Sequence, residues 1–372
     1  MRKYDVAAYV WPAYTGDEPR TRIFWPEGYG EWQTVRNAMA NAGEKPEGYK
    51  WDRQPLWGYV NEANPDVMEM EIECAARHGV NVFIYDWYWY DRRPFLENCL
   101  NDGYLKARNN DKVKFYIMWA NHDATHLWSV PLASDFISDV IWRGDVDRPE
   151  FEKVVNRIID KYFKHPSYYK IDGKPVFMIY DLQKLVDGLG GLEATKDALE
   201  YFREQAKKAG FPGVYLQIVA RGDVFTINTP EGPADAYRDF GFDGASDYQS
   251  YTVTNQKRLY DFTEVNETTA KHYDAMSKQD GICYFPSASV GWDTNPRFLK
   301  YLPRTTVNNT PENVEVAMRQ AKDYIDSHDL PAPLVTVNSW NEWTETSYLQ
   351  PDNVYGYGYL EAIKRVFVDD EE

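Results

Sequence analysis

Eight short apolar runs, each rich in β-branched or aromatic residues, recur along the chain of 372 residues and are separated by segments with helical periodicity. Runs that stay apolar throughout, such as Phe-Met-Ile-Tyr at 177–180, are typical of parallel strands that are covered on both faces. The eight runs are 4–11, 80–89, 113–121, 174–181, 214–221, 242–250, 283–293 and 334–343. Eight strands that alternate with helices predict an α/β fold, a closed (β/α)8 TIM barrel.

Helix signals stand between the runs. Asn64-Pro65 and Thr310-Pro311 each offer an N-cap followed by a proline at the first helical position. Amphipathic helices are also predicted for 151–163, 193–209 and 359–368, and we expect the last of these to pack against the first strand. An open doubly wound sheet is the alternative, but no GxGxxG or P-loop pattern follows any run, which favours the barrel.

No linker or low-complexity tract divides the chain, so we expect residues 1–372 to form a single catalytic domain. Residues 12–64, between the first run and its helix, are too many for an ordinary βα loop. This segment is rich in Trp, Tyr and Gly. We therefore expect it to lie over the mouth of the barrel.

The balance of charged residues limits which classes of binding partner are expected. Arg and Lys total 41 against 58 Asp and Glu, a formal net charge of −17, and such a surface repels nucleic-acid phosphates and anionic lipid. The 13 Trp and 29 Tyr instead suit surfaces that stack on sugar rings while donating hydrogen bonds. We expect an oligosaccharide or polysaccharide as the substrate, no nucleic acid, no membrane, and a monomer.

The cysteines and histidines give no metal signal. Cys74, Cys99 and Cys283 are scattered through apolar stretches, and the six histidines include no close pair apart from His122 and His126. No metal and no cofactor are therefore predicted. The first residues, Met-Arg-Lys-Tyr-Asp-Val, contain no signal-peptide core. We expect a periplasmic or extracellular setting if a leader has been removed and a cytoplasmic one otherwise.

Acids and aromatic residues gather at the carboxyl ends of the predicted strands, where the active sites of such barrels lie. A sugar pocket needs this mixture, because carboxylates accept hydrogen bonds from hydroxyl groups while Trp and Tyr cover ring faces. Substrate contacts are predicted for Tyr9, Trp11, Asp86, Trp87, Trp89, Trp119, Asn121, His122, Asp181, Arg221, Asp247, Tyr248, Trp292, Asn341 and Trp343. The alternatives are loop capping for the aspartates, barrel core for the tryptophans and an ion pair for Arg221. Arg297 is predicted to tie down its own loop, and Glu31 and Trp32 either close over the site or are ordinary surface residues.

The strongest segment is Trp340-Asn341-Glu342-Trp343-Thr344-Glu345, at the end of the eighth run. Its two glutamates are three residues apart, and a turn at the end of the strand can converge them on one cavity. Glycoside cleavage requires two carboxyl groups, one to protonate the leaving oxygen and one to manage the charge that develops on the sugar. The adjacent tryptophans would raise the pKa of one glutamate and keep it protonated. Glu342 and Glu345 are therefore the predicted catalytic residues, although a Glu-x-x-Glu pair taken alone is usually a solvated helix face.

This segment, together with Tyr348-Leu349-Gln350-Pro351-Asp352 and Tyr355-Gly356-Tyr357-Gly358-Tyr359-Leu360, resembles the C-terminal signature of glycoside hydrolase family 99-like (WbsX-like) proteins. Shorter matches follow in order along nearly the whole chain, at Gly30-Glu31-Trp32, Asp66-Val67-Met68, Tyr88-Trp89-Tyr90, Trp119-Ala120-Asn121, Gly173-Lys174-Pro175 and 291–297. The sequence departs from the family pattern at Thr346, Gln350 and His122, where the family often has glycine, glutamate and an acid.

The resemblance implies a (β/α)8 barrel and, as in the related endo-α-mannosidases, an endo-acting glycosidase that cleaves an α-linked, mannose-like glycan with retention. It implies that Glu342 takes the proton of the 2-hydroxyl, which attacks C1, and that Glu345 acts as general acid and then as general base. The expected role is polysaccharide degradation.

Two other functions stay open. A glycosyltransferase would bind a nucleotide diphosphate through a metal-bound Asp-x-Asp or a basic phosphate cradle. Asp145-Val146-Asp147 has that spacing, but it precedes Pro149 at a predicted helix start, where acids are expected anyway. A noncatalytic glycan-binding barrel needs aromatic residues without an acid pair, and the two glutamates count against it.

Overall fold

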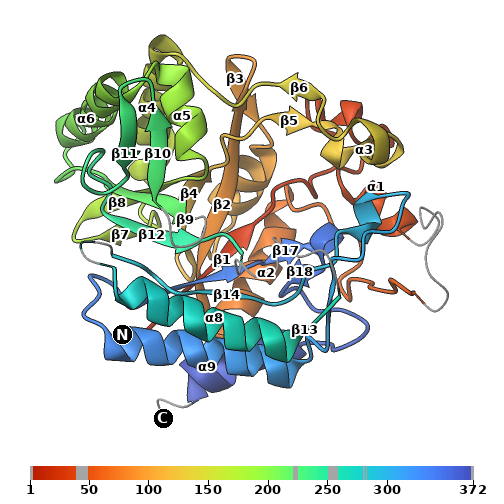
Figure 1. Cartoon of the computed structure of the whole chain (residues 1–372). Coiled ribbons are helices and arrows are strands. Elements are labelled where there is room, and N and C mark those ends of the chain that lie inside the picture. The colour runs from red at the N-terminus through yellow and green to blue at the C-terminus, as the bar shows by residue number, and fades with distance from the viewer. Residues whose placement is uncertain are drawn as a thin grey trace.

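In the computed structural model, eight parallel strands form the ring around which the rest of the chain is arranged (Figure 1). They are β1 (Asp5–Val10), β2 (Val80–Tyr90), β4 (Lys114–Trp119), β8 (Lys174–Ile179), β9 (Tyr215–Ala220), β12 (Gly244–Asp247), β14 (Ser287–Ser289) and β16 (Leu334–Asn338). Hydrogen-bonded neighbours follow the order β12-β9-β8-β4-β2-β1-β16-β14. The two end strands meet where Ala245 of β12 forms a parallel bridge with Tyr284, just before β14. The predicted (β/α)8 barrel is confirmed, and each of the eight runs coincides with one of its strands, β2 extending one residue past its run.

The structure describes residues 3–38, 49–220, 225–249, 259–279, 281 and 283–369. Within this range β1 lies between β2 and β16, with Val6 beside Val80 and Asp5 beside Leu334. The first strand of the ring is therefore a neighbour of the last. Their carboxyl ends meet, since Trp340 N donates a hydrogen bond of 2.7 Å to Tyr9 O.

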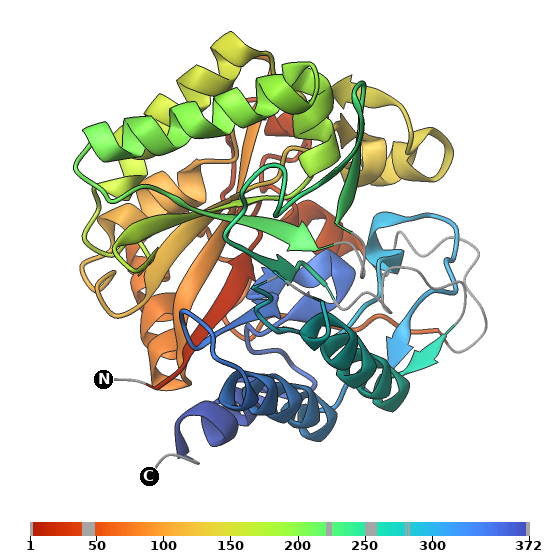
Figure 2. The same ribbon diagram turned by 60° about the vertical axis from the view of Figure 1, so that its left-hand side comes forward.

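Helices cover the outside of the ring (Figure 2). They are α2 (Pro65–Arg77), α4 (Arg148–Ile158), α5 (Leu182–Leu189), α6 (Leu192–Lys208), α8 (Phe262–Ser277), α9 (Pro311–Ser327) and α10 (Gly358–Phe367). Two short helices, α1 (Trp32–Asn37) and α3 (Val130–Phe136), instead contact η6 (Asn295–Arg297) in the connections beyond the strand ends. In both views α8 and α9 run alongside each other over one part of the ring, and α4, α5 and α6 cover another. Both predicted N-caps are confirmed, because Asn64 accepts from Asp66 N and Thr310 from Asn313 N. The last helix contacts the first strand region as expected, through Tyr4 and Phe367.

Two connections depart from the regular strand–helix alternation. Between β2 and β4 the chain forms β3 (Arg93–Phe95) and two helical turns, η2 (Cys99–Gly103) and η3 (Tyr104–Lys106). Between β9 and β12 the described residues form a hairpin of β10 (Thr226–Thr229) and β11 (Gly232–Asp235). The remaining short elements are η1 (Thr21–Ile23), β5 (Ala124–Thr125), η4 (His126–Trp128), β6 (Val140–Trp142), η5 (Ile159–Phe163), β7 (Lys170–Ile171), β13 (Tyr260–Asp261), η6 (Asn295–Arg297), β15 (Thr306–Val307), β17 (Asn341–Glu342), η7 (Trp343–Glu345) and β18 (Ser347–Tyr348).

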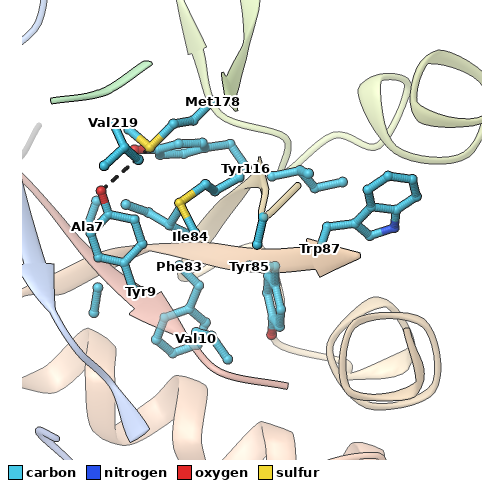
Figure 3. Packing of buried hydrophobic residues seen from close by; sticks show 14 of the residues in the cluster. Ala7, Tyr9, Val10, Phe83, Ile84, Tyr85, Trp87, Tyr116, Met178 and Val219 are labelled. Carbon is cyan, nitrogen blue, oxygen red and sulfur yellow. Dashed lines mark hydrogen bonds between the residues drawn. The ribbon is translucent and has the colours of Figure 1, made fainter. Parts of the chain in front are cut away.

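The interior of the ring is filled by side chains (Figure 3). Tyr9 of β1 points at Met178 of β8, and their Oη and Sδ atoms are 3.5 Å apart. Tyr85 of β2 instead reaches Met68 of α2, on the outside of the ring. Successive residues of a strand point to opposite faces, so each strand supplies one set of side chains to the interior and another to the helix layer. The barrel is therefore a packed core whose usable space lies only at its ends.

The long segment between β1 and α2 contacts the carboxyl end of the barrel. Its residue Trp51 donates an indole hydrogen bond of 2.8 Å to Thr346, beyond η7. Glu31, just before α1, accepts from Arg297 of η6 at 3.0 Å. Within the described ranges, no helix combines the length and the apolar character needed to cross a membrane.

Candidate active site

A cavity of about 280 Å³, here called the site cavity, opens at the carboxyl ends of the barrel strands. Seven predicted site residues line it: Trp11, Asp86, His122, Asp181, Tyr248, Glu342 and Glu345. Tyr88, Met118, Ala120, Leu127, Trp128, Tyr180 and Arg297 complete the described lining. The structure thus brings carboxyl groups and aromatic rings from strands far apart in the sequence to one place.

A turn after β16 places the two glutamates. β17 and β18 pair antiparallel, and η7 between them carries Glu345. Ser339 Oγ accepts from Glu342 N at 2.9 Å, which holds the start of this turn. Thr346 closes the turn with φ of 55°, a left-handed conformation that favours glycine. Its hydroxyl donates to Asp293 O and accepts from Trp51, which helps to hold threonine there.

One guanidinium holds both glutamates. Arg297 Nη2 donates to Glu342 Oε2 at 3.1 Å, and Nη1 donates to Glu345 Oε1 at 2.7 Å. Its Nε donates to Glu31 Oε1 at 3.0 Å. Arg297 is only 2% exposed, so its partners are these carboxylates rather than water. The prediction that Arg297 ties down its own loop is wrong, because its side chain bonds to three carboxyls from other elements.

The charges of Arg297 and its three carboxyl partners do not balance. Three carboxyl groups surround one guanidinium, and an unpaired buried negative charge is costly. Burial, and next the Glu345 charge, raise the pKa of Glu342 well above its ordinary value, while Arg297 opposes the shift. Burial also raises the pKa of Glu345, again against Arg297. Burial alone would disfavour the Arg297 cation, but the three carboxylates raise its pKa well above normal. Burial therefore favours the protonated forms of Glu342 and Glu345, and Arg297 favours their ionised forms.

Tyr248 and Gln249 complete the surroundings of the glutamates. Tyr248 Oη lies 3.0 Å from Asp86 Oδ2 and 3.3 Å from Glu342 Oε1. Gln249 Nε2 donates to Glu345 Oε2 at 2.7 Å. Burial raises the pKa of Asp86 well above its ordinary value, although the hydrogen bond from Tyr248 works the other way. Asp86 lines the site cavity, and its buried Oδ1 has no hydrogen-bond partner among the residues that the structure describes.

Strand alternation decides which predicted residues face the site cavity. On β2, Asp86 and Tyr88 line it while Trp87 and Trp89 lie on the opposite face. Trp87 donates its indole N–H to Glu97 at 2.8 Å, and Trp89 donates to Glu150 of α4 at 3.1 Å. The structure therefore places both rings in the helix layer and away from the site cavity, contrary to their predicted substrate contact.

Trp119 follows the same rule on β4. The residues on either side of it, Met118 and Ala120, line the site cavity, whereas Trp119 points to the opposite face and packs near Phe151 of α4. Asp247 at the end of β12 likewise turns outward and accepts from Tyr284 and contacts His272 of α8. These two residues do not line the site cavity either.

Two asparagines link the ends of neighbouring strands through hydrogen bonds to backbone atoms. Asn121 Nδ2 donates to Asp181 O at 2.7 Å, and its Oδ1 accepts from Asp181 N at 2.8 Å. Asn341 makes the same double contact with the backbone of Trp11, at 2.9 and 2.8 Å. Both asparagines position residues that line the site cavity and do not line it themselves.

The remaining predicted contacts lie beside or beneath the site cavity. Tyr9 is fully buried and donates to Asp247 O at 3.1 Å. Trp343 is fully buried, stacks on Tyr348 and donates to Gln350. Trp292 is buried outside the lining. Arg221 lies outside the described residues.

Sequence reasoning missed four large side chains of the lining: Tyr88, Trp128, Tyr180 and Arg297. Tyr88 and Tyr180 could have been found by strand alternation, because Tyr88 lies two residues after Asp86 and Tyr180 two residues after Met178. Trp128 comes from η4, and its ring lies 5.3 Å from that of Trp11 and 5.9 Å from that of His122. Arg297 had no local signal, since its partners are distant in the sequence.

The residues expected of a nucleotide-sugar site have other roles. Asp147 caps α4 by accepting from Glu150 N, and Asp145 pairs with Arg143 at 2.8 Å. Among the described residues that line the site cavity, Arg297 is the one Arg or Lys, and it is occupied by carboxylates. No group of three or more His, Cys, Asp or Glu suited to a metal ion occurs in the described part of the chain.

Comparisons with known proteins agree with the barrel. The family model described as glycosyltransferase WbsX matches residues 6–363. A protein of Xanthomonas campestris pv. campestris (strain B100), described as "Uncharacterized protein WxcX", is 24% identical over 369 residues, covering 93% of this chain and 47% of that protein. The chain thus spans about half the length of the curated relatives that it matches.

Solved structures share the fold at low sequence identity. The GH99 endo-α-mannosidase from Bacteroides thetaiotaomicron is 14% identical, with a TM-score of 0.60 and coverage of 98% of this chain and 96% of that one. A structure described as a glycoside hydrolase-like protein is also 14% identical, with a TM-score of 0.62 and coverage of 99% and 94%. At this identity the likeness establishes the fold alone.

Proposed function

The chain belongs to the family described as glycosyltransferase WbsX, and from this premise we propose that it is a glycoside hydrolase that acts at the site cavity. The substrate we propose is an α-linked, mannose-like glycan or polysaccharide, cleaved internally and with retention. The observation that carries the proposal is the pair Glu342 and Glu345, held by one buried guanidinium where both line an aromatic cavity.

The walls of the site cavity suit a sugar ring. Trp11, Trp128, Tyr88 and Tyr180 offer aromatic faces, which pack against the apolar face of a pyranose. Asp86 and Asp181 offer carboxyl groups for ring hydroxyls. A volume of about 280 Å³ restricts the described cavity to a small part of a polymer at a time.

The two glutamates take different roles in the proposed reaction. Glu342 removes the proton of the 2-hydroxyl, whose oxygen attacks C1, while Glu345 protonates the departing glycosidic oxygen as its bond to C1 breaks. In the second half, Glu345 takes a proton from water, which attacks C1, and Glu342 returns its proton to the 2-oxygen as the three-membered ring opens. The raised pKa of Glu345 supports its role as an acid, and the Arg297 guanidinium 3.1 Å from Glu342 favours the ionised form of Glu342 that a base requires.

The charge of the site supports hydrolysis over transfer from a nucleotide sugar. A diphosphate needs cations or a helix N-terminus, and the described lining offers one guanidinium that three carboxylates already occupy. The description of the family keeps glycosyltransfer as the second candidate. A noncatalytic glycan-binding barrel would have no use for two acids with raised pKa values at the lining.

The reaction class is tested by incubating the purified protein with a panel of α-linked polysaccharides in water enriched in ¹⁸O, with no nucleotide sugar present. We expect released oligosaccharides that carry ¹⁸O at the new reducing end, as mass spectrometry would show. Product that forms only when a nucleotide sugar is added would assign the chain to transfer. Binding of the glycans without any product, in a folded protein, would favour the noncatalytic alternative.

A further inference from the structure

Behind Glu342 lies a second group of buried acids that the proposed reaction does not use. Gln350 Nε2 donates to Glu62 Oε1 at 3.0 Å and to Glu71 Oε2 at 3.1 Å, so one amide bridges two carboxyl groups. Glu62 and Glu71 are fully buried, and none of the three residues lines the site cavity. These three residues are called the acid–amide unit below.

The side chains of Trp340, Asn341 and Trp343, which flank Glu342 in the segment 340–343, each form a hydrogen bond to this unit. Each contact is a hydrogen bond donated by a nitrogen of the segment to an oxygen of the unit. The contacts are Trp340 Nε1 to Glu71 Oε2 (2.8 Å), Asn341 Nδ2 to Glu62 Oε2 (2.9 Å) and Trp343 Nε1 to Gln350 Oε1 (2.7 Å). The acid–amide unit therefore fixes both sides of the catalytic candidate without contacting it.

The unit carries two carboxyl groups and no cation. Among the described residues that shift the pKa of Glu62 or Glu71, none is an Arg, Lys or His. The titratable groups that face them are Tyr14 on the long first segment, Tyr85 on β2, Cys99 on η2 and Cys74 on α2, with Glu18 farther away. All of these groups are neutral or negative, so two ionised carboxylates would lie buried without compensation.

We infer that Glu62, Gln350 and Glu71 act as positioning residues for Glu342, and that they do so in a form in which the two carboxyls share one proton. Both N–H groups of Gln350 are used to bridge the acids, and Glu71 Oε1 has no hydrogen-bond partner in the described part of the chain, which leaves a place for the proton. A glutamate at position 350 would replace these donors by a third carboxyl group.

The predicted direction of the pH response follows from burial. Burial, and next the charge of Glu71, raise the pKa of Glu62 well above its ordinary value, and burial raises the pKa of Glu71 to about 7. A carboxyl whose pKa is raised by folding binds more protons in the folded state, so the stability it contributes is lost as the pH rises from the unfolded value toward the folded one. The contribution of the acid–amide unit to folding stability should therefore fall between about pH 4.3 and pH 7.

The first test follows unfolding in denaturant between pH 5 and pH 7 for wild type, Glu71→Gln and the control Glu73→Gln. Glu73 lies on the same helix but is partly exposed and paired with Arg77 and Lys112. We expect the folding equilibrium constant of the wild type and of Glu73→Gln to fall about tenfold more per pH unit than that of Glu71→Gln, the effect of one proton. Equal slopes in wild type and Glu71→Gln would overturn the shared proton.

The second test measures hydrogen-exchange protection of a peptide that covers residues 338–346, corrected for the intrinsic pH dependence of exchange. In wild type we expect protection to fall between pH 5 and pH 7, and in Glu71→Gln, which retains Glu62, we expect a smaller fall. Unchanged protection in wild type would overturn the positioning role. Gln350→Glu gives a second variant should Glu71→Gln fail to fold, and it should show lower protection and a steeper slope. Neither readout uses a substrate, so their failure and that of the proposed hydrolase are separable.

Discussion

Arg297 is the residue on which the arrangement of acids depends. Its three nitrogens each bond to a carboxylate from a different element, and the whole group is removed from water. A planar guanidinium can serve three directions at once, which an ammonium group cannot do with the same geometry. The spacing of Glu342 and Glu345 is thus set from outside their own segment.

Replacing Arg297 by methionine should destabilise the fold by about 3–5 kcal/mol, because it leaves three buried carboxyl groups without their cation. Since Arg297 lowers the pKa of Glu342 and of Glu345, its loss should raise both values further. The deficit should therefore grow as the pH rises. Unfolding in denaturant at pH 5 and pH 8 measures both effects.

Arg22→Met provides the matched control. Arg22 pairs with Asp17 through two hydrogen bonds of 2.8 Å but on the surface, where water and salt screen the pair and it contributes little to stability. Arg297→Met should lower the free energy of unfolding by more than this control does, and by an amount that depends on pH. An equal loss, or a loss independent of pH, would show that Arg297 does not stabilise the three carboxylates.

The sequence predicted some of these residues and not others for a physical reason. Glu342 and Glu345 stand in one short segment, so their proximity could be anticipated from local spacing. Arg297 is separated by 45, 48 and 266 residues from its three partners, and no local pattern encodes such contacts. Its expected role was therefore local, and that expectation was wrong.

At the scale of single elements, the alternation of side chains along a strand decides which predicted substrate contacts face the site cavity and which face the helix layer. The run from Asp86 to Trp89 was assigned to the site with one exception, yet alternate members face opposite sides of β2. Composition could show that the strand ends are rich in acids and aromatic rings. To know which half of them faces the site cavity, one must know which alternate residues of each strand point inward. That is decided only when the ring closes.

The turn before α1 gives an element-scale prediction. Gly30 has φ of 58°, and a Cβ there would lie 1.9 Å from Ala13 O. Gly30→Ala should destabilise the fold by about 2–4 kcal/mol, from left-handed strain plus the clash. Because Glu31 is the next residue and bonds to Arg297, the proposed glycosidase activity should fall as well. Denaturant unfolding and a rate assay measure the two effects.

Gly58 of the same long segment serves as the control. Its φ is 72°, but a Cβ there would have nothing within 4 Å. Gly58→Ala should therefore cost only the left-handed strain, about 1–2 kcal/mol, and should leave activity unchanged. Equal losses in the two variants would show that the close approach of Gly30 to Ala13 has no energetic weight.

At the scale of the whole molecule, the barrel was predictable because strand count and apolar periodicity are global properties of the sequence. All eight strands were anticipated, although some are shorter than their runs, as β14 within 283–293 shows. The connections were less predictable. The hairpin of β10 and β11 stands where regular alternation predicts a helix, and the short turns η2 and η3 follow β2. Ring closure fixes the strands, whereas the connections are free to vary around them.

The whole molecule should be more stable at mildly acidic than at mildly alkaline pH. Burial raises the pKa of several carboxyls, among them Asp86, Glu342, Glu345 and Glu62, and raises that of Glu18 to about 7. The folded state therefore binds more protons than the unfolded state above about pH 4, and stability is lost as the pH rises through the raised values. Thermal unfolding should give a higher midpoint at pH 5 than at pH 8, and the reverse order would contradict these assignments.

The central claim is that Glu342 and Glu345 carry out cleavage in the site cavity. It is tested most directly by initial rates on one cleaved glycan for wild type, Glu342→Gln, Glu345→Gln and Glu361→Gln, an exposed glutamate on α10. The account predicts that each of the first two substitutions lowers kcat by about 10²- to 10⁴-fold, as loss of an acid or base does, while Glu361→Gln matches wild type. A folded Glu342→Gln or Glu345→Gln variant that cleaves at the wild-type rate would contradict it.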